Sequence, residues 1–318
     1  MTNIRDVARL AGVSVSTVSR VLNQHPYVQE EKRQAVLAAI EESGYVKNLN
    51  AVSLSKGKTE MVGIVLPFTD HSYFAALLKG IAEEARINSK KLVMFQTDYE
   101  TDQEIAALEM LKHKQIDACI FCSRSSDWAL IEPYQLYGQL VMCEEIHQEV
   151  SYTFIDQYGV FMKALHYLER KGYNRIGYCI GRRSGTNSQE RERAYRDFLS
   201  SRQIPFNKSW IFDDCYHVQD GERVLEEISR MTDKPDALLV TNDQTAAGIL
   251  LTAEKTGLNI PQDLGIMGFE NHPIAEMLSI TTIDLPLEEM GRNLFKQAIK
   301  HGIEKHEVTV SLIERRTL

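Results

Sequence analysis

The sequence predicts a small all-α module at the amino terminus and a larger α/β body that contains two doubly wound parallel sheets. Charge separates the two parts: residues 1–58 carry eight Lys and Arg against five Asp and Glu, whereas the remainder carries 28 against 39. In the remainder, short apolar runs alternate with amphipathic stretches of helix length, which is typical of parallel strands joined by helical crossovers. There are about ten such runs, too many for one sheet of ordinary size, so we expect two sheets.

The composition and motif content exclude several classes of protein. The chain has 318 residues, of which 43% are apolar and 25% charged, and this favours a folded chain over a fibrous or disordered one. It has no apolar run long enough to span a bilayer and no signal-peptide pattern at its start, so we expect a cytoplasmic protein with no membrane partner. The five cysteines lie mostly in or beside apolar runs, which indicates reduced, buried thiols. We find no metal-binding, dinucleotide-binding or nucleophile motif, and therefore expect no metal, no cofactor and no enzymatic activity.

The first 44 residues show three helical patterns in succession. The first covers residues 4–11, with Ile4 and Val7 on its apolar face, and Gly12 supplies the turn that follows it. Ser14 is a good N-cap for a second helix over residues 15–22. A third helix over residues 30–43 completes a small core and ends at Gly44. Two short helices joined by a tight turn predict a helix-turn-helix.

The outward face of the second helix suits DNA. Val15 is small and apolar enough to contact a thymine methyl group, Ser16 can bond a base edge, and Arg20 can donate two hydrogen bonds to guanine. Thr17 and Ser19 are short hydroxyl donors that suit phosphate. These five side chains are the predicted contacts of the module with double-stranded DNA. The alternative is a helical hairpin that only packs, which the cap, turn glycine and polar face disfavour.

The segment Asp6-Val-Ala-Arg-Leu-Ala-Gly-Val-Ser-Val-Ser-Thr-Val-Ser-Arg-Val-Leu-Asn23 resembles the head of the lactose-repressor/galactose-repressor (LacI/GalR) family of bacterial transcription factors. Residues 48–59 resemble the hinge of that family. The resemblance implies that this hinge folds on operator DNA, with contacts from Asn48, Ala51 and Leu54 and with Leu54 wedged into the minor groove. Lys47 and Val52 stand where proline and arginine are typical. The alternative for residues 48–59 is a plain linker.

In the body, ligand-binding side chains are expected directly after strands, because doubly wound sheets bind ligands at the carboxyl ends of their strands. Tyr73 and Phe74 follow the run at 61–67, Glu144 follows the run at 139–143, and Glu270 follows the run at 264–268. Aromatic faces combined with carboxylates and amides suit the C–H faces and hydroxyl groups of sugars.

The body also resembles the sensing domain of the same family, which is similar to periplasmic sugar-binding proteins. The matching segments are Asp156-Gln-Tyr-Gly159, Lys171-Gly-Tyr-Asn-Arg-Ile-Gly177, Asn242-Asp-Gln244 and Gly268-Phe-Glu-Asn271. The resemblance implies that Arg191 and Asn242 bond effector hydroxyls and that Tyr216 offers an aromatic face. Ala194 and Glu270 stand where glycine and aspartate are usual. As alternatives, Arg191 could be a solvated charge, Asp156 and Asp243 could be helix caps, and Tyr216 could belong to the core.

Together these observations predict a division into a headpiece (1–47), a hinge (48–59), a first subdomain (60–157 and 286–318) and a second subdomain (158–285). The predicted protein is a repressor of carbohydrate-related genes that binds pseudo-palindromic operator DNA. Its effector would be a sugar or sugar phosphate in the interdomain cleft. Since the chain ends soon after the last predicted strand (308–313), with no heptad tail, we expect a homodimer. The alternatives are control by a partner protein, as in catabolite regulators, a solute-binding protein, or a cofactor-dependent enzyme.

Overall fold

The computed structural model describes residues 2–46 and 57–318, and the chain divides into two compact units, Met1–Thr59 and Glu60–Leu318. The predicted hinge contacts Asn48, Ala51 and Leu54, and the unusual residues Lys47 and Val52, lie outside the described residues.

The first unit contains the three predicted helices, α1 (Ile4–Leu10), α2 (Val15–Leu22) and α3 (Glu30–Ser43). The hydroxyl of Ser14 caps α2 by accepting a hydrogen bond from the Thr17 amide at 3.2 Å. Gly44 ends α3 with a φ of +60°, a conformation that glycine adopts without strain. Val7, Val18 and Val36 are fully buried and form the small core in which the three helices meet. The predicted helix-turn-helix is therefore confirmed.

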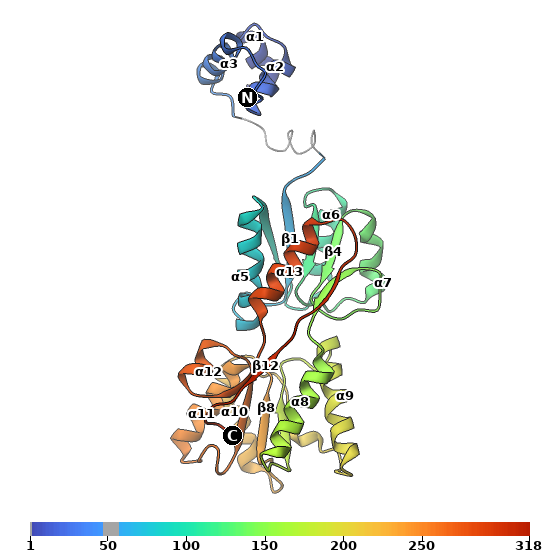
Figure 1. Cartoon of the computed structure of the whole chain (residues 1–318), viewed down its shortest axis with the longest axis vertical. Helices are drawn as coiled ribbons and strands as arrows, with labels where there is room; N and C mark the ends of the chain where they lie inside the picture. The colour runs from blue at the N-terminus through green and yellow to red at the C-terminus, as the bar shows by residue number, and fades with distance from the viewer. Residues whose placement is uncertain (1, 47–56) are drawn as a thin grey trace. The chain divides into compact units, whose positions relative to one another are not determined.

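The second unit is built on two six-stranded sheets, which define a first lobe and a second lobe (Figure 1). The first sheet has the order β11-β5-β4-β3-β1-β2 and the second has the order β12-β10-β9-β8-β6-β7. Strands of the first are β1 (Met61–Leu66), β2 (Lys91–Gln96), β3 (Ala118–Phe121), β4 (Gln139–Met142), β5 (Ser151–Phe154) and β11 (Lys305–Glu307). Strands of the second are β6 (Ile176–Cys179), β7 (Ile211–Phe212), β8 (Ala237–Val240), β9 (Gly265–Glu270), β10 (Thr281–Asp284) and β12 (Ser311–Ile313).

Helices join the strands, and all strand pairings except β10 with β12 are parallel, as the alternating pattern predicts. The first lobe contains α5 (Ser72–Ile87), α6 (Thr101–Lys112), α7 (Trp128–Ile131) and α13 (Leu287–Ile299). The second contains α8 (Gln157–Arg170), α9 (Thr186–Ser201), α10 (Asp220–Arg230), α11 (Asp243–Thr256) and α12 (Pro273–Met277). Within the described part of the chain, we find no helix with the length and apolar character needed to cross a membrane.

The end of the chain corrects one expectation. The sequence pattern predicts that residues 286–318 lie wholly in the first lobe, but β12 pairs antiparallel with β10 in the second sheet, with Leu312 opposite Ile283. Thr317 fixes the segment there, because its hydroxyl donates to the Ile266 carbonyl at 2.6 Å and accepts from the Thr281 amide. The chain thus passes between the lobes three times, at residues 155–156, 285–286 and 308–310. The strand expected over 308–313 begins only at Ser311, and β11 was not predicted because its three residues are polar and exposed.

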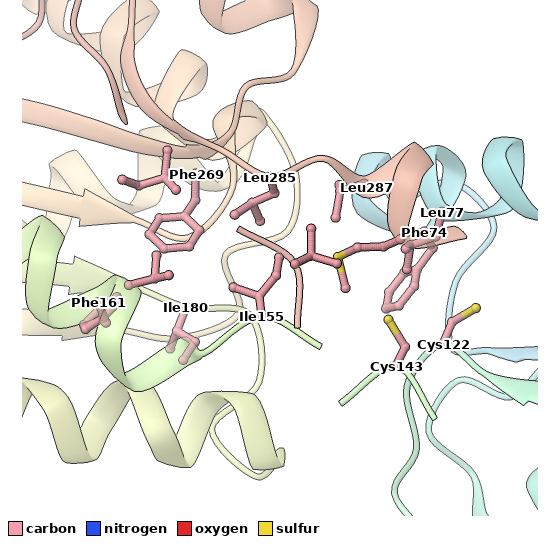
Figure 2. Close-up of a cluster of buried hydrophobic side chains, with 14 of the residues drawn as sticks. Phe74, Leu77, Cys122, Cys143, Ile155, Phe161, Ile180, Phe269, Leu285 and Leu287 are labelled. Atoms are coloured by element: carbon pink, nitrogen blue, oxygen red, sulfur yellow. The ribbon is translucent and has the colours of Figure 1, made fainter. Parts of the chain in front are cut away.

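One apolar core continues from lobe to lobe along the crossing segments. Figure 2 shows Phe269 and Phe161 in the second lobe, Ile155 and Leu285 in two crossing segments, and Phe74 in the first lobe. Ile155 and Leu285 are each 3% exposed. Burying an aliphatic side chain of this size contributes about 1.5–3 kcal/mol. The crossing segments are therefore held by apolar packing on both sides, which fixes where the two sheets face each other.

Helices α5 and α13 approach each other so closely that backbone touches backbone. A Cβ added to Gly80 would lie 2.0 Å from the Glu288 carbonyl oxygen, and one added to Gly291 would lie 2.1 Å from the Leu77 carbonyl oxygen. The Glu288 carbonyl belongs to α13 and the Leu77 carbonyl to α5. Neither carbonyl can move away without separating the two helices. The contact positions α13, and with it the crossing segment that precedes it.

We expect Gly80→Ala to destabilise the protein by about 1–3 kcal/mol, the usual cost of overpacking. Without the clash, the same change would stabilise the helix, since alanine is favoured over glycine in helix interiors by up to about 1 kcal/mol. Urea unfolding monitored by circular dichroism measures the difference. Ala82→Ser, on the exposed side of α5, is the control and should change the free energy of unfolding little. A Gly80→Ala protein as stable as the wild type would contradict the close contact.

Candidate functional site

The outward face of α2 presents exposed side chains, and among them the Arg20 guanidinium has no partner in the described part of the chain. Val15 is 41% exposed, Ser16 and Arg20 are exposed, and Val18 on the opposite face is fully buried. The guanidinium of Arg20 forms neither a hydrogen bond nor an ion pair with any residue that the structure describes. Its charge is therefore available to an external partner, and a guanidinium matches the two acceptors of guanine.

The hydroxyl groups at the beginning of α2 form a cluster. Ser14 Oγ lies 2.8 Å from Ser16 Oγ and 2.9 Å from Thr17 Oγ1. Thr17 and Ser19 are partly exposed rather than fully outward. The first turn of a helix also offers free amides and the positive end of the helix dipole, which together suit a phosphate. All five side chains predicted to contact DNA are at least partly exposed on α2. Their contacts with DNA stay a prediction.

In the body, a cavity of about 130 Å³ lies between the two lobes, where the carboxyl ends of the strands face each other. All seven side chains predicted to bind an effector line it: Tyr73, Phe74, Glu144, Arg191, Tyr216, Asn242 and Glu270. The first three come from the first lobe and the other four from the second. The structure thus brings together residues that are up to 197 positions apart in the sequence.

Three further lining residues, Tyr99, Arg124 and Arg182, were not predicted. They follow β2, β3 and β6 respectively. The rule that ligand-binding residues follow strands could have found all three.

Arg191 turns into the cavity. Its Nε donates a hydrogen bond to Gln157 Oε1 at 2.9 Å, and its guanidinium lies 5.2 Å from the centre of the Phe269 ring. Its two terminal nitrogens have no partner among the residues described. Arg193, two positions later, pairs instead with Glu190 along the outside of α9. The alternative of a solvated charge therefore fits Arg193 and not Arg191.

On the opposite wall, Glu144 forms an ion pair with Arg124. The side chains are only 12% and 16% exposed, so the pair is shielded from water. Glu104 stabilises the loop that carries Arg124. Its carboxylate is fully buried and accepts hydrogen bonds from the Ser125 and Ser126 amides at 2.6 and 2.9 Å. Arg124 and Glu144 are therefore fixed in place on this wall.

Glu270 is 6% exposed and accepts a hydrogen bond from Ser72 Oγ of the other lobe at 2.9 Å. Its φ of +114° is unusual for a residue with a side chain, and such strain is often found at functional sites. Burial raises the pKa of Glu270 well above its usual value, and the nearby Asp243 adds to this effect while Arg191 opposes it. Through its hydrogen bond with Ser72, Glu270 bridges the lobes.

Asn242 and Tyr216 complete the wall of the second lobe. Asn242 caps α11, because its Oδ1 accepts from the Thr245 amide at 2.7 Å and its Nδ2 donates to the Cys215 carbonyl at 2.7 Å. One amide hydrogen of Asn242 is left for a ligand. The Tyr216 ring packs against Phe68 of the first lobe at 5.6 Å between ring centres and lies beside Gly181, where a Cβ would come within 2.5 Å of it. Burial raises the pKa of Tyr216 to about 12, so its hydroxyl is neutral.

Comparison with known proteins decides the family. A family model described as bacterial regulatory proteins of the lacI family matches residues 3–48, and one described as periplasmic binding proteins and sugar binding domain of LacI family matches residues 59–317. The chain belongs to the LacI family. Its members are DNA-binding transcriptional regulators, so this protein is a regulator and not an enzyme.

Two relatives from Bacillus subtilis (strain 168) match over almost the whole chain. An uncharacterized HTH-type transcriptional regulator, YkvZ, is 39% identical and covers 100% of both chains. The NTD biosynthesis operon regulator NtdR is 37% identical over 99% of this chain and 96% of its own length. Among solved structures, a lac repressor dimer bound to operator and the anti-inducer ONPF has a TM-score of 0.79 at 21% identity, and the match covers 99% of this chain and 98% of that chain. This regulator therefore shares the LacI-family fold.

Two aspartates near the cavity of this LacI-family regulator were predicted as possible caps, and only one is. Asp156 caps α8 by accepting from the Gly159 amide at 2.8 Å. Asp243 instead lies fully buried beneath Glu270, where it accepts from Thr282 Oγ1 and the His272 amide, both at 2.8 Å. Burial raises the pKa of Asp243 to about 7 despite these hydrogen bonds. In the described residues, no group of His, Cys, Asp and Glu is arranged to hold a metal ion.

We expect the Asp243 carboxyl to make stability fall as pH rises from about 4 to about 7. Its folded pKa of about 7 lies above its unfolded value of about 3.9, so the folded state binds the proton more tightly across this range. One such group contributes a slope of at most about 1.4 kcal/mol per pH unit. Urea unfolding at several pH values should show a flatter profile for Asp243→Asn than for the wild type. Asp156→Asn is the control, and identical slopes in all three proteins would contradict the assignment.

Proposed function

We propose that this LacI-family protein is a homodimeric repressor of carbohydrate-related genes and that a small sugar or sugar phosphate in the cavity between the lobes controls its binding to operator DNA. One observation carries the proposal: seven side chains that suit a polyol converge on a single cavity, in a chain that also presents a helix with exposed Val15, Ser16 and Arg20. A transport protein needs no such helix.

The DNA-binding part rests on the face of α2. Val15, Ser16 and Arg20 offer an apolar contact, a hydroxyl and a bidentate donor in the order that a major groove can accommodate. One such helix reads only a few base pairs, so affinity and specificity require two copies related by a dyad. A homodimer on a pseudo-palindromic operator supplies both, and Asn48, Ala51 and Leu54 are proposed to contact the site between the two helices.

The effector part rests on the chemistry of the cavity. Tyr73, Phe74 and Tyr216 provide aromatic surface. Arg191 and the carboxyl groups of Glu144 and Glu270 provide hydrogen-bond donors and acceptors that are not all used within the protein. A cavity of about 130 Å³ resembles in size the roughly 150 Å³ that accommodates one six-membered ring in an engineered protein cavity. These features favour a single-ring polyol, with or without a phosphate.

Control by a partner protein is the alternative. A cavity lined by donors without partners among the described residues favours a small ligand, because such hydrogen-bonding groups are costly where they are shielded from water. Under the alternative, operator affinity would respond to a partner such as a phosphorylated carrier protein and to no small molecule. Either ligand acts only if it binds one arrangement of the lobes more tightly than the other.

We expect Arg20→Ala to weaken binding to an operator obtained by in vitro selection by about 1–3 kcal/mol and to relax the preference at one base pair of each half-site. Binding to scrambled duplex should change much less. Fluorescence anisotropy at fixed salt measures both affinities. Arg9→Ala, on an exposed pair of α1 with Asp6, is the control and should affect the two duplexes equally. Equal losses on both duplexes for Arg20→Ala would rule out a base-reading role.

We expect one of a panel of monosaccharides and their phosphates, including glucose, ribose and glucose 6-phosphate, to raise the melting temperature of the full chain by about 5 °C at saturating concentration. Arg191→Met should abolish the shift, because it removes the unpaired guanidinium nitrogens from the cavity. Arg193→Met, on the outer face of the same helix, should retain it. A panel without any hit, or the same loss in both variants, would speak against a sugar effector in this cavity.

A further inference from the structure

Several contacts between described residues join the two lobes around the cavity, among them the packing of His71 against Tyr216 and the three contacts that follow. Ser72 of the first lobe bonds Glu270 of the second, Phe68 packs on Tyr216, and Arg182 of the second lobe reaches Tyr99 and Arg124 of the first. Glu270, which bonds Ser72, lies at the end of β9, and β9 neighbours the strand β10 that leads into a crossing segment. The contact of Arg182 with Tyr99 and Arg124 lies farther from the crossing segments.

The position of the Arg182 contact follows from the order of the strands. The crossing segments leave the first sheet at β5 and β11 and the second at β10 and β12, which are at one edge of each sheet. Tyr99 follows β2, the opposite edge of the first sheet, and Arg182 follows β6, next to the opposite edge of the second. A contact on the side away from the crossing segments opposes rotation of the lobes about those segments.

The contact itself is close. The Arg182 guanidinium carbon lies 3.7 Å from the centre of the Tyr99 ring, and its Nη2 donates to the Arg124 carbonyl at 2.9 Å. A planar guanidinium stacks on an aromatic face and still donates hydrogen bonds from its edge, which a lysine ammonium cannot do in the same way. Both interactions join a single side chain of the second lobe to the first.

The residues that receive Arg182 are held in place within their own lobe. The Ser125 hydroxyl donates to the Tyr99 carbonyl at 2.6 Å, so the loop after β2 is tied to the loop after β3. Glu104 fixes the amides of Ser125 and Ser126, and Glu144 fixes the side chain of Arg124. Arg182 therefore contacts a surface that is already ordered. Little of the free energy of this contact is spent on ordering Tyr99 and the Arg124 carbonyl.

We propose that Arg182, together with Tyr99 and the Arg124 carbonyl, forms a latch that holds the two lobes closed over the cavity and so helps to set the balance between the closed and open arrangements. All three residues also line the cavity, so opening the latch widens its mouth. The effect on lobe closure does not depend on which ligand is bound, whereas its consequence for DNA binding rests on the proposed function.

The neighbouring Arg183 offers a matched control. It pairs with Asp213 and donates to the Ile211 carbonyl, both in its own lobe. Arg183→Ala thus removes an arginine of similar exposure without touching the other lobe. Arg182→Ala removes the latch, Arg182→Lys keeps the charge but loses the planar stack, and Tyr99→Leu removes the ring from the other side.

Lobe separation is measured in the full chain by double electron–electron resonance between spin labels at Asp102→Cys and Ser209→Cys, both exposed and one in each lobe. The five native cysteines are buried and should not take up label. Mixing with excess unlabelled protein suppresses distances between protomers. We expect longer and broader distances in Arg182→Ala and Tyr99→Leu, a smaller shift in Arg182→Lys, and no shift in Arg183→Ala. Unchanged distances in both Arg182→Ala and Tyr99→Leu, with native circular dichroism, would overturn the latch.

Operator affinity gives the second readout. We expect Arg182→Ala to change it by roughly two- to thirtyfold, the range of one cation–π contact, and Arg183→Ala to leave it unchanged. Longer distances with unaltered operator affinity would overturn the link between the latch and DNA binding. If the wild type selects no operator at all, the proposed function fails, and the distance measurement still decides whether the latch exists.

Discussion

The arrangement of the body depends on one constraint: the carboxyl ends of two parallel sheets must face each other. Parallel strands need helical crossovers, so every loop that leaves a carboxyl end is free to carry polar side chains, while the helices cover the apolar faces. Three crossing segments packed in one apolar core keep the two sheets face to face. The contact of Gly80 and Gly291 between α5 and α13 places one of these segments. Residues far apart in sequence thereby meet in one cavity.

This constraint also creates an unusual electrostatic environment. Glu270, Asp243 and Arg191 are drawn out of water near one another, yet no ion pair joins them among the described residues. Burial raises the pKa of both acids because the charged form loses its hydration. Buried ionisable groups without an ion-pair partner lower the stability of the folded state. Hydroxyl groups of a ligand can bond both an acid and a guanidinium, so the same feature that weakens the protein suits a polyol.

The periodicity of the sequence was sufficient to predict the two sheets and the three helices of the headpiece, because strand-length apolar runs and helical faces are local properties. Two further arguments predicted the seven residues that line the cavity: the rule that ligand-binding residues follow strands, and the resemblance to a known family. The periodicity could not predict β11, whose polar residues pair only at a sheet edge, or the return of β12 to the second sheet, since both depend on distant partners. The burial of Asp243 and the contact of Arg182 with Tyr99 likewise arise only when the lobes meet.

The strength of the contacts between the lobes bears on how such a protein can be switched. A ligand shifts an equilibrium only by the difference between its affinities for the two arrangements, and a shift from 1:99 to 99:1 requires about 5.5 kcal/mol. A contact worth about 0.5–2 kcal/mol, such as a stacked guanidinium, biases closure without exceeding what a small ligand can supply or remove. A buried salt bridge across the cleft, by contrast, would cost roughly 3–5 kcal/mol to break on one side. The ion pair that lines this cavity, Arg124 with Glu144, stays within the first lobe, and the nearby pair of Arg183 with Asp213 stays within the second. The contacts named above that cross the cleft are instead stacking, apolar and single hydrogen bonds. That distribution keeps each wall rigid and leaves the closure itself reversible.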